Sequence, residues 1–148
     1  MGSFHDENMN FEIGRAYRLR EGTDITIAAS GAPLAAALEA AGILEREGIS
    51  AEVLDFTTVK PLDAETLIES VKKTGALVTM EEHNICGGLG SAAAEVLGEQ
   101  YPVRMKRIGM EDCFGESGTY RELLEKYGIC SAQAVRWAKL LLDKEIAG

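Results

Sequence analysis

The sequence lacks an apolar run long enough to cross a membrane, and it lacks an excess of positive charge. Glu39 interrupts the longest alanine-rich stretch, whereas a membrane-spanning helix needs about 18 consecutive apolar residues. Fifteen Lys and Arg residues against 24 Asp and Glu residues give a net charge of −9, which argues against a general affinity for phosphate backbones or anionic lipid surfaces. We therefore expect no membrane and no nucleic acid as partners.

The sequence also lacks paired cysteines and a secretory segment. Cys86, Cys113 and Cys130 are odd in number and show no C-x-x-C spacing, so a disulfide framework is not expected and a reducing compartment fits better. No apolar segment of the secretory type stands near Met1. These features predict a cytoplasmic protein.

Length and composition are those of one globular domain. The chain has 148 residues, of which 46% are apolar and 26% charged, and a single domain typically contains about 100–200 residues. Residues 1–10 have little apolar pattern and are expected to be a disordered tail or a cloning remnant. We expect the domain to comprise residues 11–148.

Four apolar, β-rich segments alternate with segments of helical period, which is typical of an α/β domain with a parallel sheet. The strands are expected at residues 25–29, 53–56, 76–81 and 103–108. Two segments, 17–20 and 103–106, alternate apolar with basic residues as half-exposed edge strands do. The sequence therefore predicts strands 17–20 and 103–108 at opposite edges of the sheet.

The helices are expected between these strands, and several end signals mark them. Asp63 is a plausible N-cap and Gly75 a C-terminal stop for one helix, with Lys73 on its solvent face, while Gly48 follows the end of another. Thr119 and Glu122 form a capping box for a later helix. The helices are expected from Leu34, Ala64, Leu89, Tyr120 and Ser131 onward.

The segment from Glu81 to Ser91 is the strongest candidate for a binding loop. Its glycines leave backbone N–H groups at a helix N-terminus, which can bind an anion, and Gly88, Gly90 and Ala93 match G-x-G-x-x-A. A stand-alone module that binds a nucleotide or a phosphate is therefore one hypothesis. The favoured interpretation is structural, because four polar residues separate the apolar strand from the glycines and the glycines permit close contact between helix and sheet.

Metal binding and nucleophilic catalysis have weaker support. His83, Cys86 and Cys113, with Glu81 or Asp112 as a fourth ligand, could form a zinc site, but a second Cys or His pair is lacking. Neither His83 nor Cys86 has a visible catalytic triad.

Several motifs together resemble the C-terminal domain of transketolase. They are EEH at 81–83, GGLGS at 87–91, FGESG at 114–118 and ELLEKYG at 122–128. The resemblance extends from Phe11 to about Leu142 and is closest to the transketolase that is split into two chains. Related domains stand at the C-terminus of deoxyxylulose-phosphate synthase and of the two-chain 2-oxo acid dehydrogenases.

The resemblance implies a three-layer α/β/α sandwich with a mixed five-stranded sheet. The implied strand order is first, third, second, fourth, fifth, with the first strand antiparallel. This order places a switch point between strands 25–29 and 76–81, where ligands of open α/β sheets bind. The residues expected at or near this edge are Ser30, Gly31, Glu81, His83, Asn84, Gly87, Gly88, Gly90, Glu116 and Ser117.

The resemblance also implies the activity of a parent enzyme, which moves two-carbon ketol units between sugar phosphates, as in the pentose phosphate pathway. The parent uses thiamine diphosphate and Mg²⁺, held through a Gly-Asp-Gly motif that this sequence does not contain. We therefore expect no catalytic residue, no cofactor and no metal bound by this domain alone.

The expected role is that of a supporting domain. Its partners would be the N-terminal and pyrimidine-binding domains or subunit of the parent enzyme, which is expected to be a homodimer. Besides the phosphate-binding module, the remaining alternative is a domain that docks a partner protein, as related domains do in 2-oxo acid dehydrogenase complexes.

Overall fold

The computed structural model describes residues 12–84, 87–110 and 120–144. The expected tail, residues 1–10, lies outside these ranges. Among the described residues, no helix combines the length and apolar character needed to span a membrane.

The centre of the fold is a mixed five-stranded sheet. The strand order is β1-β3-β2-β4-β5; β1 runs antiparallel to β3, and the remaining neighbours are parallel. The implied order and the predicted edge strands are therefore confirmed. The strands are β1 (Ala16–Arg20), β2 (Ile25–Ser30), β3 (Ala51–Phe56), β4 (Ala76–Asn84) and β5 (Arg104–Met110).

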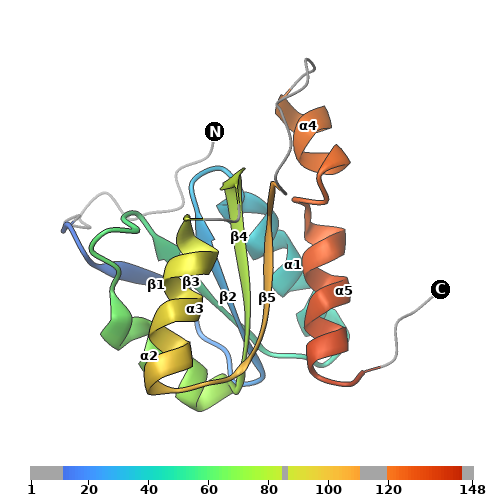
Figure 1. The fold of residues 1–148 in the computed structure, drawn as a ribbon. Coiled ribbons are helices and arrows are strands. Elements are labelled where there is room, and N and C mark those ends of the chain that lie inside the picture. Colours follow the sequence, from blue (N-terminus) through green and yellow to red (C-terminus); the bar gives the residue numbers. More distant parts are fainter. Residues whose placement is uncertain (1–11, 85–86, 111–119, 145–148) are drawn as a thin grey trace.

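Helices cover both faces of the sheet, which gives the expected three layers (Figure 1). Helices α1 (Leu34–Arg46) and α5 (Ser131–Leu141) enclose one hydrophobic core with the sheet, and α2 (Ala64–Thr74) and α3 (Leu89–Gln100) enclose the other. The short α4 (Tyr120–Lys126) precedes α5 and lies beyond its N-terminal end, at the upper right of Figure 1.

Several predicted helix ends agree with the structure. Gly48 and Gly75 adopt left-handed φ angles of 80° and 78°, a conformation that glycine reaches without a Cβ penalty. Helix α3 ends at Gln100, before Pro102. Thr119 of the expected capping box lies outside the described residues.

A buried carboxylate that sequence analysis missed joins α2 to the sheet. Strand β3 begins earlier than the expected residue 53, so Glu52 lies inside it and is fully buried. The Ser70 hydroxyl and the Lys73 ammonium both donate to this carboxylate, and Arg18 Nε lies 3.3 Å from it. Lys73 is exposed, as expected, and its ammonium also pairs with Glu52. Burial by itself raises the pKa of Glu52, but these donors outweigh it and hold the pKa below its usual value.

Asp63 is the predicted N-cap of α2, and it also holds the first strand. Its Oδ1 accepts a hydrogen bond from the Thr66 N–H at 3.1 Å, and its Oδ2 accepts one from the Ala16 N–H at 2.8 Å. One carboxylate thereby connects edge strand β1 to α2. Burial opposes ionisation of Asp63, yet the hydrogen bonds outweigh burial and lower its pKa.

We expect Asp63→Asn to lower the free energy of unfolding at pH 7 by about 1–2 kcal/mol. Because the folded pKa of Asp63 is lowered, the carboxylate stabilises the fold fully above the unfolded pKa of about 3.9, and this contribution is lost as the pH falls through the folded pKa. The deficit of the variant should therefore shrink below about pH 4 in urea unfolding curves recorded at pH 7, 4 and 3. Glu65→Gln, at an exposed position in the same helical turn, is the control and should change stability by less than about 0.5 kcal/mol. A deficit of Asp63→Asn that is the same at pH 7 and pH 3 would contradict this account.

Candidate functional site

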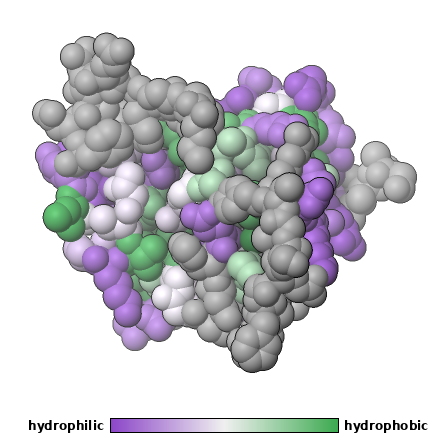
Figure 2. Space-filling model, turned by 90° about the horizontal axis from the view of Figure 1, so that it is seen from above, coloured by the Kyte–Doolittle hydropathy of each residue, from purple (hydrophilic) through white to green (hydrophobic). Residues whose placement is uncertain are grey.

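The candidate site lies at the carboxyl edge of the sheet, between β2 and β4. The chain leaves β2 through α1 toward β3 and leaves β4 through α3 toward β5, so the two connections diverge here. Ser30 and Glu81, both expected at this edge, are direct partners in the β2–β4 register. Figure 2 looks down on this edge, where the described surface mixes hydrophilic and hydrophobic residues.

Gly31 and Glu82 bring the two loops together. Gly31 has a φ of 76°, and a Cβ atom there would lie 3.1 Å from the Glu82 Oε1. The absence of a side chain at residue 31 therefore gives the Glu82 carboxylate room beside the β2 loop. This contact places a negative charge at the switch point.

The Glu81 carboxylate caps the N-terminus of α3. Its side chain is almost completely buried, at 2% exposure. Oε1 accepts a hydrogen bond from the Leu89 N–H at 2.9 Å, and Oε2 accepts one from the Gly90 N–H at 2.7 Å. Hydrogen bonds to an ionised acceptor are stronger than neutral ones, and the positive end of the helix dipole also favours a negative charge here.

The Glu81 carboxylate occupies part of the anion site that the glycines at 87–90 predict. Two of the backbone N–H groups that could hold a phosphate already donate to the protein's own carboxylate. A phosphate at the same place would have to displace Glu81 and would meet its charge. The geometry therefore disfavours a nucleotide or phosphate at the Gly87–Gly90 turn.

Gly87 and Gly88 form the turn that leads into the helix. Gly87 has a left-handed φ of 84°, and its N–H donates to the Ser91 Oγ at 3.0 Å. Gly88 is the N-cap residue in an extended conformation. The absence of side chains here lets the chain reverse closely after β4.

Gly90 has a different role, because it allows α3 to approach the sheet. A Cβ atom at residue 90 would lie 2.8 Å from the Arg107 Cγ and Cδ and 2.9 Å from the Thr79 Oγ1. These distances agree with the interpretation that glycine permits close helix-to-sheet packing in this segment.

The other candidate residues are described only in part or not at all. His83 and Asn84 belong to the backbone of β4, where Asn84 pairs with Met110 of β5. Cys86, Cys113, Glu116 and Ser117 lie outside the described residues, so the zinc hypothesis and the second loop have no structural account. In the ranges that the structure does describe, no group of three or more His, Cys, Asp or Glu side chains could hold a metal ion.

Comparison with known proteins decides the family. Residues 14–134 match the family model described as "Transketolase, C-terminal domain". The chain belongs to the transketolase C-terminal domain family. The transketolase C-terminal domain seen here has a TM-score of 0.91 and 48% identity to a solved structure titled "Split gene transketolase, inactive beta4 tetramer", covering 98% of this chain and 48% of that one.

Two curated relatives cover nearly the whole chain. A 6-deoxy-6-sulfo-D-fructose transketolase subunit from Clostridium sp. (strain MSTE9) is 50% identical over 94% of this chain and 43% of its own length. A 1-deoxy-D-xylulose-5-phosphate synthase from Heliobacterium modesticaldum is 42% identical over 95% of this chain and 22% of its own length. The transketolase C-terminal domain thus spans less than half the length of these relatives.

The described residues do not fit the thiamine diphosphate and Mg²⁺ that the family implies. The buried carboxylate at the switch point faces its own helix rather than open space, and the Glu82 carboxylate beside Gly31 adds negative charge where a diphosphate would need positive charge or free donors. The sequence also has no Gly-Asp-Gly motif. We derive no catalytic step through these groups on this chain.

We expect Glu81→Gln to lower the free energy of unfolding by about 1–3 kcal/mol. An amide has only one acceptor oxygen, so one of the two α3 N–H groups would face an NH₂ group, and the charge at the helix N-terminus would be lost. Guanidinium unfolding curves measure the effect. Glu95→Gln, at an exposed position on the same helix, should stay within about 0.5 kcal/mol of the parent protein. Equal stability of the two variants would show that the cap contributes nothing.

We expect Gly90→Ala to destabilise the protein by about 1–3 kcal/mol, because its methyl group would overlap Arg107 and Thr79. Gly98→Ala is the matched control on the same helix, since nothing lies within 4 Å of a Cβ atom there. In that open position alanine should stabilise the helix by about 0.5–1 kcal/mol. Opposite changes in thermal midpoint are expected, and a change of the same sign in both variants would contradict the close-approach explanation.

Proposed function

We propose that this chain is the non-catalytic C-terminal supporting domain of a two-chain transketolase-type enzyme. In this proposal, companion domains hold thiamine diphosphate and Mg²⁺, and the assembled enzyme transfers two-carbon ketol units between sugar phosphates. Support comes from the split-gene transketolase and the transketolase subunit that this chain resembles over nearly its whole length. The proposal includes a domain that begins at residue 11. It also includes a cytoplasmic location, because an odd number of cysteines without C-x-x-C spacing favours a reducing compartment.

The observation that carries the proposal is the inward-facing carboxylate of Glu81. In an enzyme whose chemistry took place on this domain, the switch point would present free donors or acceptors to a ligand. Here the buried acid and the first N–H groups of α3 satisfy each other. The edge therefore holds a helix in place, as expected for a domain whose role is to support its neighbours.

The proposed partners are the catalytic domains that precede this one in the parent enzyme, together with a dimer mate. Ile13, just before β1, is 84% exposed, and burial of this large aliphatic side chain against a neighbour would lower the free energy. Tyr101, at the end of α3, is a second large exposed side chain. Tyr101 already has the Lys72 Nζ 5.6 Å from its ring centroid, so Ile13 is the stronger support for a contact with a neighbouring domain.

The chain alone should neither bind thiamine diphosphate nor transfer ketol units. Calorimetric titration with thiamine diphosphate and Mg²⁺ is expected to give no saturable heat. A coupled assay with a ketose phosphate donor and an aldose phosphate acceptor should show activity only after the companion subunit from the same source is added. Saturable cofactor binding or ketol transfer by the chain alone would overturn the proposal, as would a stable complex with the companion that remains inactive.

A further inference from the structure

Several basic side chains of this fold are paired with a carboxylate. Arg20 pairs with Glu45 at 2.8 Å, and Lys139 pairs with Glu47 at 2.6 Å. On β5, Arg104 pairs with Asp143 at 2.9 Å. Such pairing is expected in a chain with a net charge of −9, because acidic groups are abundant near any cation.

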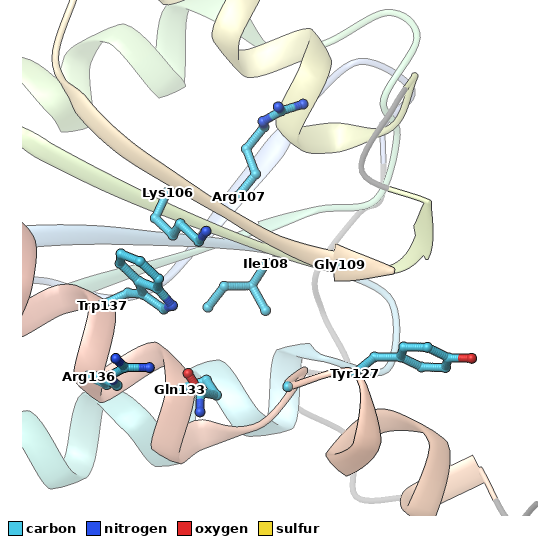
Figure 3. A pocket seen from close by; sticks show the side chains of 9 residues that line it. Lys106, Arg107, Ile108, Gly109, Tyr127, Gln133, Arg136 and Trp137 are labelled. Carbon is cyan, nitrogen blue, oxygen red and sulfur yellow. The ribbon is translucent and has the colours of Figure 1, made fainter. Parts of the chain in front are cut away.

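Lys106 and Arg136 are among the described basic residues that have no such carboxylate partner. Among the described residues, no ion pair joins either of them to a carboxylate. Both instead lie against the indole of Trp137: the Lys106 Nζ is 4.1 Å and the Arg136 Cζ 5.7 Å from the ring centroid. Figure 3 shows Lys106 reaching from β5 over Trp137, with Arg136 beside the ring on α5.

These side chains line a hollow of about 200 Å³ between β5 and α5. Ile108 and Gln133 also line it, and none of the described residues around it is acidic. The Arg107 side chain extends toward the opposite face of the sheet, where it donates to the Ser91 Oγ at 3.3 Å (Figure 3). The charge of the hollow therefore comes from Lys106 and Arg136.

The positive charges of Lys106 and Arg136 are not neutralised by a carboxylate among the described residues that line the hollow. Two cations near one ring repel each other, and the negative face of the indole compensates only part of this repulsion. A compact dianion within reach of both cations would gain two charge-assisted hydrogen bonds, and the Gln133 amide offers a neutral donor on the same side of α5. The volume is below the roughly 300 Å³ at which pockets for larger ligands begin, which favours a small anion.

We propose that this hollow binds a phosphate group, either as inorganic phosphate or as the phosphate of a small phosphomonoester. The site lies on the α5 face of β5, apart from the Glu81 cap at the carboxyl ends of β2 and β4. It depends on neither ketol transfer nor thiamine diphosphate, so it can be tested separately from the proposed function.

The chain contains its own reporter, because Trp137 is its only tryptophan. We would titrate the full chain with inorganic phosphate, ribose 5-phosphate and ribose at constant ionic strength, with NaCl as the balancing salt. Saturable changes in indole fluorescence with both phosphates, and none with ribose, are the expected result. Equal affinity for the two phosphates would identify the phosphate group alone as the ligand, whereas tighter binding of ribose 5-phosphate would identify a phosphomonoester.

Variants show whether the two cations carry the binding. Lys106→Met and Arg136→Met should each weaken phosphate binding about tenfold, the loss expected for one charge-assisted hydrogen bond. Arg104→Met is the matched control, because Arg104 lies on the same strand but is paired with Asp143; its affinity should stay within about twofold of the parent. Since removing a cation also changes the emission of Trp137, calorimetry provides the affinity in parallel.

Three results would overturn the proposal. The first is a fluorescence change that grows linearly with phosphate or is reproduced by NaCl alone, which would indicate general ionic screening. The second is unchanged phosphate affinity in the Lys106→Met, Arg136→Met double variant. The third is an equal loss of affinity in Arg104→Met, which would show a diffuse effect of charge rather than a site.

Discussion

The fit of the Glu81 carboxylate onto the first N–H groups of α3 is the constraint on which the carboxyl edge depends. Burying an ionised carboxylate is costly unless hydrogen bonds replace its hydration, and here two backbone donors do so at 2.9 Å and 2.7 Å. The contact fixes where β4 ends and where α3 begins, and it requires the glycine turn between them. It also occupies two of the N–H donors that a ligand at this edge of an open α/β sheet would use.

A second buried carboxylate, Glu52, has a similar role on β3, the neighbour of β2 on the side opposite to β4. Glu52 is held by Ser70 and Lys73 of α2, whereas Glu81 is held by backbone groups of α3. Each acid thus connects the sheet to one of the two helices on the same face. Removing the partners of a buried charge is strongly destabilising, so the position of each helix is tied to its carboxylate.

The edge strands could be predicted because their signal is local, whereas the full strand order came from the resemblance to the transketolase C-terminal domain. Alternation with basic residues marked β1 and β5 as edges, and both are edges. The Asp63 cap was predictable for the same reason, since its partner lies three residues away. Glu52 and Lys73 were missed because their contact joins residues 21 positions apart, and hydrophobic periodicity records burial without recording which polar groups meet. Glu81 was recognised as an edge residue, but its partner could be identified only once α3 was placed above β4.

The same distinction between local and long-range information applies to charge. A net charge of −9 describes the whole chain and argues correctly against general affinity for phosphate backbones. It does not describe the field inside one hollow, which depends on the few charges within about one Debye length, roughly 8–10 Å. Lys106 belongs to the expected edge strand 103–108, and no local pattern in the sequence relates it to Trp137 of the last helix. Only the packing of α5 against β5 brings the Lys106 Nζ to 4.1 Å from the centroid of the Trp137 ring. An acidic domain therefore still has a basic hollow on one face.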